Sequence, residues 1–484
     1  MRKWSLLLVL AVLLAVVPAA AQNTPQSVCL ITDVGFLFDG GFNQSTYNGV
    51  QRAVEVYGLS DTFIETQAAT DYEANIQRCL NDGFDIVITV GFALTDATRA
   101  AAIANPDHYF IGVDQDFLSV EPVPNLVGLQ FREDQGGFLA GAMAALMTES
   151  NIVGGVYGVD FAPVVKFRNG FEQGARYINP DITALGSYTE SFETPTIGAE
   201  VALTLIGEGA DVIFGAGGRT GTGAIREAAA RDTLVIGVDL DQYFTDFEGG
   251  DAPGAENIIT SALKSVDNGV FTLIERLVNG GAFPDNSTYV VSIANGGIDF
   301  APTHDADVPQ EVLERLTDIR EGLREGTIVT GVDPVFGTLL PDLAEVAADA
   351  GDFSTLLLTA QAAGLLEALS GDEPLTIFAP TDAAFLAELE FLGASSVEEL
   401  LNNPEGLSTL LRYHVIPGQA LTTEIIETLD ITTVETLDGD TLELMIDADG
   451  QLTVDGSPVI TADVPASNGI IHVIETVLVP PSQR

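Results

Sequence analysis

The sequence predicts an α/β protein built on parallel sheets, followed by a smaller α+β domain. Three observations support this prediction. Over about the first 300 residues, short apolar runs that fit buried strands alternate with segments of helical periodicity. The ends of these runs carry glycines and carboxylates, as the ligand-facing loops of open parallel sheets do. Beyond a boundary near Thr330, helices come first, and short alternating runs separated by turn signals follow.

The first loop of the chain sets the pattern for the predicted site. Residues 28–32 form an apolar run that fits a buried parallel strand, and apolar residues at helical spacing follow between positions 50 and 57. The loop DVGFLFDGGFNQS at 33–45 carries carboxylates, amides and aromatic rings among glycines. This composition after a parallel strand predicts a small-molecule site. The alternative is a glycine-rich connection whose Asp and Asn side chains cap turns and the following helix.

The same alternation continues through the first large unit. Further apolar runs that predict buried strands lie at 85–90, 109–113, 126–130, 152–157, 183–188, 212–215 and 234–238. Helical spacing appears over 71–81 and, at the end of the unit, over 309–324. Alternation of this kind requires parallel sheets with right-handed crossovers.

Polar residues and glycines recur where these strands end. They are Asp33, Gly91, Phe92, Asp114, Asp160, Gly215, Ala216, Gly217, Gly218 and Asp239. Two sheets facing each other across a cleft would bring these loops together around one guest. The run GAGGRTGTG at 215–223 has dinucleotide-like glycine spacing, but it lies late in the chain, and the next strand ends in GVDLDQ rather than a lone ribose carboxylate. We therefore predict a tight turn that brings backbone amides to a ligand.

Length and charge narrow the possible functions. The 484 residues suit about three domain-sized units, and 46% hydrophobic content with 7% aromatic residues indicates a globular chain. Seventy Asp and Glu against nineteen Lys and Arg give a formal charge of −51, which excludes nucleic-acid partners and disfavours anionic lipid surfaces. The only lysines are Lys3, Lys166 and Lys264, so the last two are candidates for specific charged partners.

The N-terminus predicts export. Arg2 and Lys3 precede an apolar run over 6–17, and AAA follows at 19–21, which together have the three regions of a secretory signal. We expect residues 1–21 to be removed and the mature protein to be secreted, periplasmic or at the cell surface. Since no other run is long and apolar enough to span a bilayer, and no cysteine follows the cleavage site to take a lipid, we expect no membrane insertion after cleavage.

The two cysteines, Cys29 and Cys79, predict a disulfide in an exported chain. Cys29 lies near the start of the first predicted strand and Cys79 near the end of the second helix, so both fall at the sheet edge away from the ligand loops. Closing a loop of about 50 residues would stabilise this unit by roughly 4 kcal/mol. The alternative is two buried thiols, because Cys79 shares a helical face with Ile76 and Leu80.

The change in pattern near Thr330 predicts three segments in the mature chain. We expect the first unit to span 22–330, a linker to span 331–340 and a C-terminal α+β domain to span 341–481. Asp-Gly and Asn-Gly pairs between short alternating runs indicate hairpins in that last domain.

Five motifs in order over about 300 residues resemble the basic membrane protein family. They are DVG at 33–35 with Asp39 and FNQS at 42–45, GVDFAPVVKFRNGFEQGARYINP at 158–180, AGGRTGTG at 216–223, IGVDLDQ at 236–242 and TSALKSVDNGV at 260–270. Members of this family have the type I periplasmic-binding-protein fold and deliver nucleosides to ABC transporters. The resemblance therefore implies two Rossmann-like lobes joined by three crossing strands, a nucleoside in the cleft and an ABC permease as partner.

The C-terminal part resembles a fasciclin domain. LTIFAPTDAAF at 375–385, YHV at 413–415 and SNGIIHVIETVLVPP at 467–481 are similar to its two signature regions and its central motif. That module is associated with adhesion, which implies a matrix or cell-surface partner. His414 and His472 lie among Val and Ile with no acidic neighbour at ligand spacing, so we expect hydrogen-bonded core residues rather than metal ligands.

The first resemblance assigns residues to the ligand. The matching positions are Asp33, Asp39, Phe42, Asn43, Asp114, Phe167, Gly217, Asp239 and Lys264. Phe42 and Phe167 match rings that stack on the base from opposite lobes, each worth about 1–3 kcal/mol. The alternative for these aromatic rings is the core, and for the aspartates it is helix capping.

Base and ribose contacts follow from the same matching positions. Asp33, Asn43 and Asp114 match positions that meet the base edge. Asp239 and Lys264, with the backbone near Gly217, match positions around the ribose hydroxyls, and we expect Lys264 both to donate to ribose and to hold Asp239 ionised. The sequence departs from the family pattern at Phe36, Phe38 and Gly41, which leaves the base preference open.

These features favour a nucleoside-binding component of an ABC transporter, with purines preferred. A second hypothesis is an extracellular adhesion or sensor protein in which the fasciclin domain defines the role. A third is an enzyme such as a nucleoside hydrolase, but no Ser/His or Cys/His nucleophile set appears. We expect no catalysis, no cofactor and no bound metal.

Overall fold

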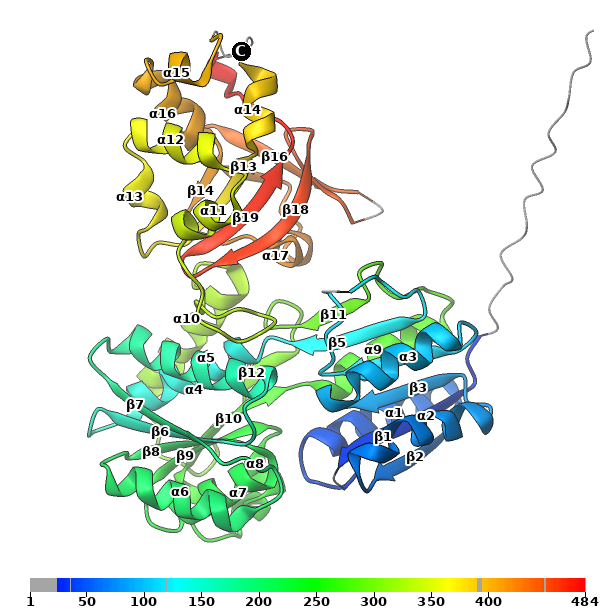
Figure 1. The fold of residues 1–484 in the computed structure, drawn as a ribbon. Helices are drawn as coiled ribbons and strands as arrows, with labels where there is room; N and C mark the ends of the chain where they lie inside the picture. The colour runs from blue at the N-terminus through cyan, green and yellow to red at the C-terminus, as the bar shows by residue number, and fades with distance from the viewer. Residues whose placement is uncertain (1–23, 35, 119, 390–393, 448–449, 484) are drawn as a thin grey trace, which may run out of the picture.

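The structure is a computed structural model that describes residues 24–34, 36–118, 120–389, 394–447 and 450–483 (Figure 1). The predicted signal peptide, residues 1–21, lies outside the described residues. Two α/β lobes lie side by side, and a third domain sits at the end of the chain (Figure 1). Within the described ranges, no helix combines the length and apolar character needed to cross a bilayer.

The first lobe is built on a six-stranded sheet in the order β11-β5-β4-β3-β1-β2, in which every neighbouring pair is parallel. Its elements are β1 (Ser27–Val34), α1 (Phe42–Tyr57), β2 (Ser60–Thr66), α2 (Tyr72–Asn81), β3 (Ile86–Val90), α3 (Thr95–Ala104), β4 (Tyr109–Val113), β5 (Leu126–Phe131), α9 (Val266–Val278) and β11 (Thr288–Val291). The disulfide Cys29–Cys79 joins β1 to α2 in the buried layer behind the sheet.

The second lobe has a six-stranded sheet in the order β12-β10-β9-β8-β6-β7, parallel except for the β10–β12 pair. Its elements are α4 (Glu133–Met147), β6 (Ile152–Tyr157), α5 (Ala162–Ile178), β7 (Thr183–Tyr188), α6 (Pro195–Gly207), β8 (Val212–Ala216), α7 (Gly218–Ala229), β9 (Leu234–Asp239), α8 (Gln242–Thr245), β10 (Ile258–Lys264), β12 (Ile298–Phe300) and the following α10 (Gln310–Glu325).

The chain passes between the lobes three times, as the resemblance implies. The crossings join β5 to α4, β10 to α9, and β11 to β12. Because the carboxyl ends of the parallel strands in both sheets face the same gap, the loops that follow them converge there. This topology confirms the predicted fold class.

Each strand predicted from an apolar run is present, with bounds that differ by no more than two residues. In the two lobes, the strands that the apolar runs did not predict are β2, β10, β11 and β12. The sequence of β2, SDTFIET, pairs only with β1 and is largely polar and partly exposed, so it lacks the apolar run of a central strand.

Helices α4 and α5 pack unusually closely, because glycines face the backbone of the opposite helix. A Cβ on Gly137 or Gly141 of α4 would overlap the backbone of α5, and one on Gly170 or Gly174 of α5 would overlap α4. This contact fixes the start of α4 relative to α5. Helix α5 carries residues of the candidate site described below, and α4 begins at Glu133, which pairs with Lys264 of that site.

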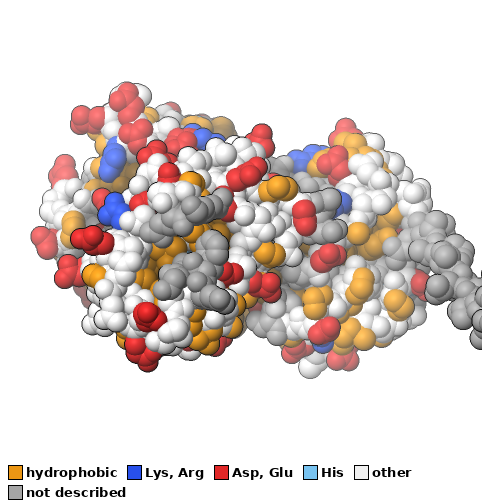
Figure 2. All heavy atoms as spheres, turned by 90° about the horizontal axis from the view of Figure 1, so that it is seen from above, with side chains coloured by type: hydrophobic (Ala, Val, Ile, Leu, Met, Phe, Trp, Pro, Cys, Tyr) orange, Lys and Arg blue, Asp and Glu red, His pale blue; other side chains and the backbone are white. Residues whose placement is uncertain are grey.

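The C-terminal domain has a seven-stranded sheet in the order β14-β13-β19-β18-β17-β16-β15. Its elements are α11 (Leu343–Ala350), α12 (Ser354–Ala362), α13 (Leu366–Leu369), β13 (Leu375–Pro380), α14 (Asp382–Glu388), α15 (Val397–Leu400), α16 (Pro404–Tyr413), β14 (Val415–Pro417), α17 (Thr423–Thr428), β15 (Thr433–Glu435), β16 (Thr441–Ile446), β17 (Leu452–Val454), β18 (Ser457–Ala466) and β19 (Gly469–Ile474). Seen from above, the molecule shows many acidic and few basic side chains (Figure 2).

The C-terminal domain contacts the lobes at the crossings. Glu424 of α17 accepts hydrogen bonds from Ser292 (2.7 Å) and Asn295 (2.9 Å), which lie between β11 and β12. In the segment that precedes the domain, Thr330 donates to Asp134 of α4 at 2.6 Å, and the carbonyl of Gly337 accepts from Asn169 of α5 at 2.6 Å. The segment between the lobes and the last domain is therefore packed against the second lobe.

Both predicted core histidines are buried and hydrogen-bonded to the backbone. Nδ1 of His414 lies 2.8 Å from the carbonyl of Leu410, and its Nε2 accepts from the amide of Leu478 at 2.9 Å. Since a backbone amide can only donate, this pair of contacts requires the neutral ring with the proton on Nδ1. Burial lowers the pKa of His414 from 6.5 to about 4.

We expect the C-terminal domain to lose stability as the pH falls below about 6.5. In the unfolded chain His414 is protonated below about pH 6.5, whereas in the folded chain it is protonated only near pH 4. This difference lowers the free energy of unfolding by up to about 3 kcal/mol as the pH falls from 6.5 to 4. Hydrogen exchange of peptides from 341–481 in the full chain, at pH 7 and pH 5, measures this loss. In His414→Gln the extra loss between the two pH values should disappear, whereas His108→Gln should keep it. An unchanged pH dependence in His414→Gln would contradict this assignment.

Candidate functional site

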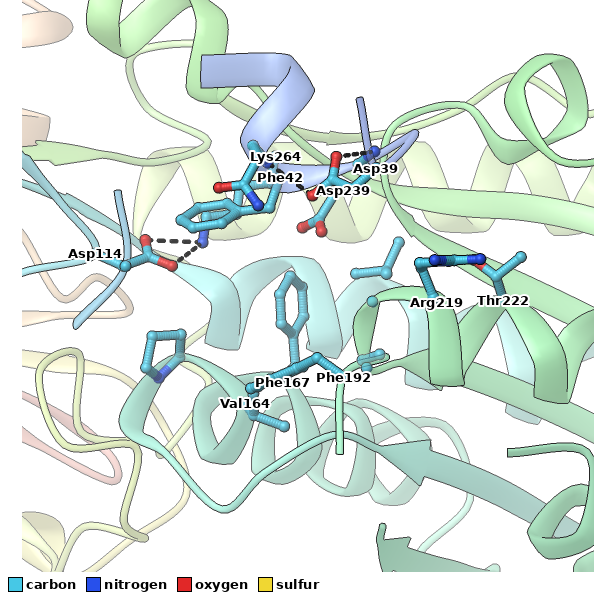
Figure 3. Close-up of a pocket in the computed structure, with 18 of the residues that line it drawn as sticks. Asp39, Phe42, Asp114, Val164, Phe167, Phe192, Arg219, Thr222, Asp239 and Lys264 are labelled. Carbon is cyan, nitrogen blue, oxygen red and sulfur yellow. Dashed lines mark hydrogen bonds and ion pairs between the residues drawn. The ribbon is translucent and has the colours of Figure 1, made fainter. Parts of the chain in front are cut away.

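A cavity lies between the lobes at the carboxyl ends of both sheets, and all nine predicted ligand residues line it (Figure 3). The first lobe contributes the β1–α1 loop and the ends of β3 and β4. The second lobe contributes the start of α5, the loop after β7, the start of α7 and the ends of β9 and β10. The sequence prediction thus selected residues that the fold brings together.

Asp39 organises the loop before α1. Its carboxylate accepts hydrogen bonds from the backbone amides of Gly41 (2.8 Å), Asn43 (3.0 Å) and Gln44 (3.2 Å). This is the turn-capping role that the sequence left open as the alternative. It holds Phe42 and Asn43 at the cavity, so Asp39 shapes the site through the loop.

Asp33 and Asn43 form a polar corner at the end of β1. Burial raises the pKa of Asp33 to about 7, and the charges of Asp39, Glu193 and Asp114 add to this rise, while the Asn43 side chain opposes it. Gly91 is required beside this corner, because its φ is +97° and a Cβ there would press on the Asp33 carboxylate. Oδ1 of Asn43 is buried without a hydrogen-bond partner among the described residues. The corner therefore holds an unused acceptor and a carboxyl group that titrates near neutral pH.

Lys264 differs from its predicted role. Its ammonium lies 2.9 and 2.8 Å from the two carboxylate oxygens of Asp114 and 2.8 Å from Oε1 of Glu133. Two of the three ammonium N–H donors are hydrogen-bonded to Asp114, and the contact with Glu133 is an ion pair. In this arrangement Lys264 pairs with Asp114 and Glu133, and no hydrogen bond or ion pair joins it to Asp239 among the described residues. Its charge still opposes the effect of burial on the pKa of Asp239, as expected for a cation that favours the ionised carboxylate. Lys264 supports the site by orienting Asp114, which is 9% exposed and faces the cavity.

Asp239 stands at the end of β9 without a basic partner in contact. Burial raises its pKa to about 7, and the charge of Lys264 offsets only part of this effect. Asp239 and Asp114 both adopt positive φ, 66° and 57°, a conformation that few residues other than Gly, Asn and Asp adopt readily. Two strand-end carboxylates in left-handed conformations at one cavity point to a functional constraint.

Aromatic rings line the cavity from both lobes. Phe42 extends from α1, with the Lys264 ammonium 4.8 Å from its ring centre, and Phe167 extends from α5 toward the same space (Figure 3). Phe167 is only 6% exposed, so it is partly the core residue that the sequence allowed as the alternative. The rings of Phe92 and Phe161, one from each lobe, meet across the cavity with their centres 3.8 Å apart.

Several lining residues were missed in the sequence prediction. Phe161 and Phe192 were not chosen, and Phe92 was noted only as a strand-end residue. All three stand in loops after predicted strands, which is the signal that could have selected them. Glu133 was missed because it follows a crossing strand and carries no ligand motif of its own.

The glycine loop after β8 forms the start of α7. Gly217 precedes α7, and a Cβ there would collide with the backbone of Gly158. The start of the helix thus approaches the cavity as backbone, which favours hydrogen-bond acceptors on a guest. Arg219 on the same turn is paired with Glu193 at 3.6 Å.

Two family models match the chain. The model described as ABC transporter substrate-binding protein PnrA-like matches residues 26–330, and the fasciclin domain model matches residues 351–480.

Similar proteins support the first match. The chain is 28% identical over 314 residues to the ABC transporter nucleoside-binding protein BmpA of Lactococcus lactis subsp. cremoris, covering 62% of this chain and 88% of that protein. It is 34% identical over 242 residues to basic membrane protein A of Borreliella burgdorferi, covering 49% of this chain and 68% of that protein. A solved ABC-transporter solute-binding protein from Aeropyrum pernix has the same fold, with a TM-score of 0.56, 24% identity and coverage of 72% of this chain and 100% of that chain.

We expect Asp239→Asn to stabilise the protein at pH 8 by about 2 kcal/mol. The pKa of Asp239 is about 7 in the folded chain and 3.8 in the unfolded chain. The ionised carboxylate therefore destabilises the folded protein, and this destabilisation increases as the pH rises from about 4 to 7. Asn tolerates the positive φ and carries no charge. Denaturant unfolding at pH 4 and pH 8 measures the effect, which should vanish at pH 4.

The matched control for this prediction is Asp241→Asn in the same loop. Asp241 caps α8 through the Tyr243 amide and lies 2.8 Å from Nε2 of His304, so its replacement should lower stability. Destabilisation by Asp239→Asn at pH 8 would show that this carboxylate is structural.

Proposed function

Because this chain belongs to the family of PnrA-like ABC transporter substrate-binding proteins, we propose that its cavity binds a nucleoside, with purines preferred, and presents it to a membrane permease. The observation that carries the proposal is that aromatic side chains from both lobes, Phe42 and Phe167, line the same cavity as the strand-end carboxylates. The similar protein from L. lactis is named as nucleoside-binding, which supports the same ligand class here. A binding role rather than catalysis agrees with the solute-binding protein from A. pernix.

The base occupies the space between the rings. A flat heterocycle gains about 1–3 kcal/mol from stacking on an aromatic ring, and either purines or pyrimidines gain it. At its edge, Asp33 and the unused Oδ1 of Asn43 accept hydrogen bonds from base N–H groups. A purine presents a larger stacking face than a pyrimidine, which favours purines.

The ribose lies toward Asp239. A carboxylate with no basic partner in contact accepts two hydroxyl donors, and the amides at the start of α7 near Gly217 donate to the hydroxyl oxygens. Lys264 contributes through Asp114, not by donating to the ribose.

Release and capture follow from the three crossings. The lobes rotate about these segments, so that opening separates Phe42 from Phe167 and closing buries the ligand. In this proposal the permease partner recognises the closed form.

We expect nucleosides to bind at least about 30-fold more tightly than their 5′-monophosphates. Asp33, Asp39, Asp114 and Asp239 surround the cavity, and a phosphate would meet their repulsion at low dielectric. The nearby cations do not compensate, since Lys264 is already paired with two carboxylates, Asp114 and Glu133, and Arg219 lies beside Glu193. Calorimetric titration of adenosine, guanosine, uridine and the matching monophosphates measures the ratio.

A matched pair of variants controls this titration. Phe42→Ala should weaken every nucleoside about tenfold or more, because it removes one stacking face. Phe38→Ala, in the same loop but 67% exposed and outside the cavity, should leave binding within about twofold. Equal affinity for adenosine and its monophosphate would exclude the charge selection, and absence of binding by every nucleoside would exclude the proposed ligand.

The fasciclin domain supplies a second role in this proposal, retention at the cell surface. It has its own buried core, and among the residues that the structure describes none beyond Lys264 lines the cavity. The domain therefore leaves the ligand site complete in the preceding part of the chain.

We expect a chain that ends after residue 340 to bind adenosine within about threefold of the full protein, because this end keeps the Gly337 contact with α5. Its association with cells or matrix should be lost. Calorimetry and a fractionation of the expressing cells measure the two outcomes. Loss of binding would show that the domains are interdependent, and unchanged association would refute retention by the fasciclin domain.

A further inference from the structure

We propose that Glu133, which does not line the cavity, is a positioning residue for the ligand site: it holds Lys264, and through Lys264 it sets the carboxylate of Asp114. The inference rests on the proposed nucleoside-binding function and adds to it a residue that the ligand never touches. Two lysines, Lys166 and Lys264, remain after removal of the predicted signal peptide.

Both lysines converge on Glu133. Oε1 of Glu133 lies 2.8 Å from Nζ of Lys264, and Oε2 lies 2.5 Å from Nζ of Lys166. Neither carboxylate oxygen makes a well-aligned hydrogen bond, so these contacts are ion pairs. Lys166 also donates to the carbonyl of Phe131 at 2.8 Å. The two oxygens of one carboxylate thus contact two cations, Lys166 of α5 and Lys264 of β10, that are 98 positions apart in the sequence.

Charges of alternating sign form a continuous buried row, Asp114–Lys264–Glu133–Lys166. The side chains of both lysines are 3% exposed and that of Glu133 is fully buried. A buried charge without a partner is strongly unfavourable, so each member depends on its neighbours for its ionised state. Burial alone would lower the pKa of Lys264, but Asp114, Glu133 and Asp239 raise it above its ordinary value.

The position of Glu133 in the chain explains why it can do this. It is the first residue of α4, directly after the crossing from β5, where the helix dipole favours a negative charge. Its neighbours do not compete for the lysines, because Arg132 makes two hydrogen bonds of 2.8 Å to Asp134. The start of α4 is in turn held by the close glycine packing against α5. The position of Glu133 is therefore fixed by packing beside the first crossing, which joins β5 to α4.

The buried row connects Asp114, at the cavity wall, to Glu133. Asp114 ends β4 in the first lobe, whereas Lys264 ends β10 in the second, so the Asp114–Lys264 pair joins the two lobes. Two of the three ammonium donors are on Asp114, and the negative charge of Glu133, 2.8 Å away, attracts the same ammonium from the second lobe. Without that attraction the ammonium can rotate away, and Asp114 loses the orientation in which it meets the ligand.

The test is a double-mutant cycle in the full chain, using adenosine titrations of the wild type, Glu133→Gln, Lys264→Met and the double variant. We expect Glu133→Gln to weaken adenosine binding about tenfold in the wild-type background. In the Lys264→Met background it should add less than about twofold, because its route to the ligand is already gone. Additive losses would overturn the inference.

Lys166→Met is the matched control. It removes the other ion pair of Glu133 and leaves the pair with Lys264, so adenosine affinity should stay within about threefold. A loss equal to that of Glu133→Gln would mean that general damage to the buried row, rather than the position of Lys264, weakens binding. That result would also overturn the inference.

A second measurement does not depend on Lys264→Met folding. The expected mature chain has only Lys166 and Lys264, so selective nitrogen-15 labelling of lysine gives two ammonium signals. Adenosine should shift the Lys264 signal in the wild type, and Glu133→Gln should move that signal before ligand is added, whereas Glu172→Gln should not. An unmoved Lys264 signal in Glu133→Gln would overturn the positioning role. If the wild type bound no nucleoside, the proposed function would fail separately.

Discussion

The ion pair between Asp114 and Lys264 is the interaction on which the arrangement of the site depends. It joins the end of a strand in one lobe to the end of a strand in the other, with both partners largely buried. The chain has only nineteen Lys and Arg and a formal charge of −51, and burying one of its few lysines carries a desolvation cost that close carboxylate partners must offset. Burial raises the pKa of Asp114, and the charge of Lys264 opposes that rise directly, while Asp33 and Asp239, which have no cation in contact among the described residues, have pKa values raised to about 7.

That difference divides the carboxylates of the cavity into two kinds. Asp114 is held by a cation, whereas Asp33 and Asp239 hold their charge weakly until something donates to them. A neutral ligand with several N–H and O–H donors satisfies them without bringing a charge of its own. The fold places this polar surface at the carboxyl ends of two parallel sheets, and the same crossings that allow the lobes to close also carry Glu133 and contact the fasciclin domain.

Much of the fold and the membership of the site could be predicted from the sequence, because both depend on local patterns. Central parallel strands are continuous apolar runs, and the residues that follow them must converge, which is why Asp33, Asp114 and Asp239 could be placed at one cavity. The polar edge strand β2 left no such pattern. The roles of individual residues inside the site were harder to predict from the sequence. The family resemblance places Lys264 beside the ribose and Asp239, but it does not show which of several carboxylates lies within reach of a long side chain, and the ion pairs with Asp114 and Glu133 were not predicted. Glu133 depends on a contact between three segments, and only the folded chain reveals it.

Native mass spectrometry of the full protein, purified without added ligand, tests the central claim most directly. The proposed function requires a bound species whose mass matches a nucleoside, released when the protein is denatured and lost in Phe42→Ala. A co-purified sugar, amino acid or nucleotide in place of a nucleoside would contradict it.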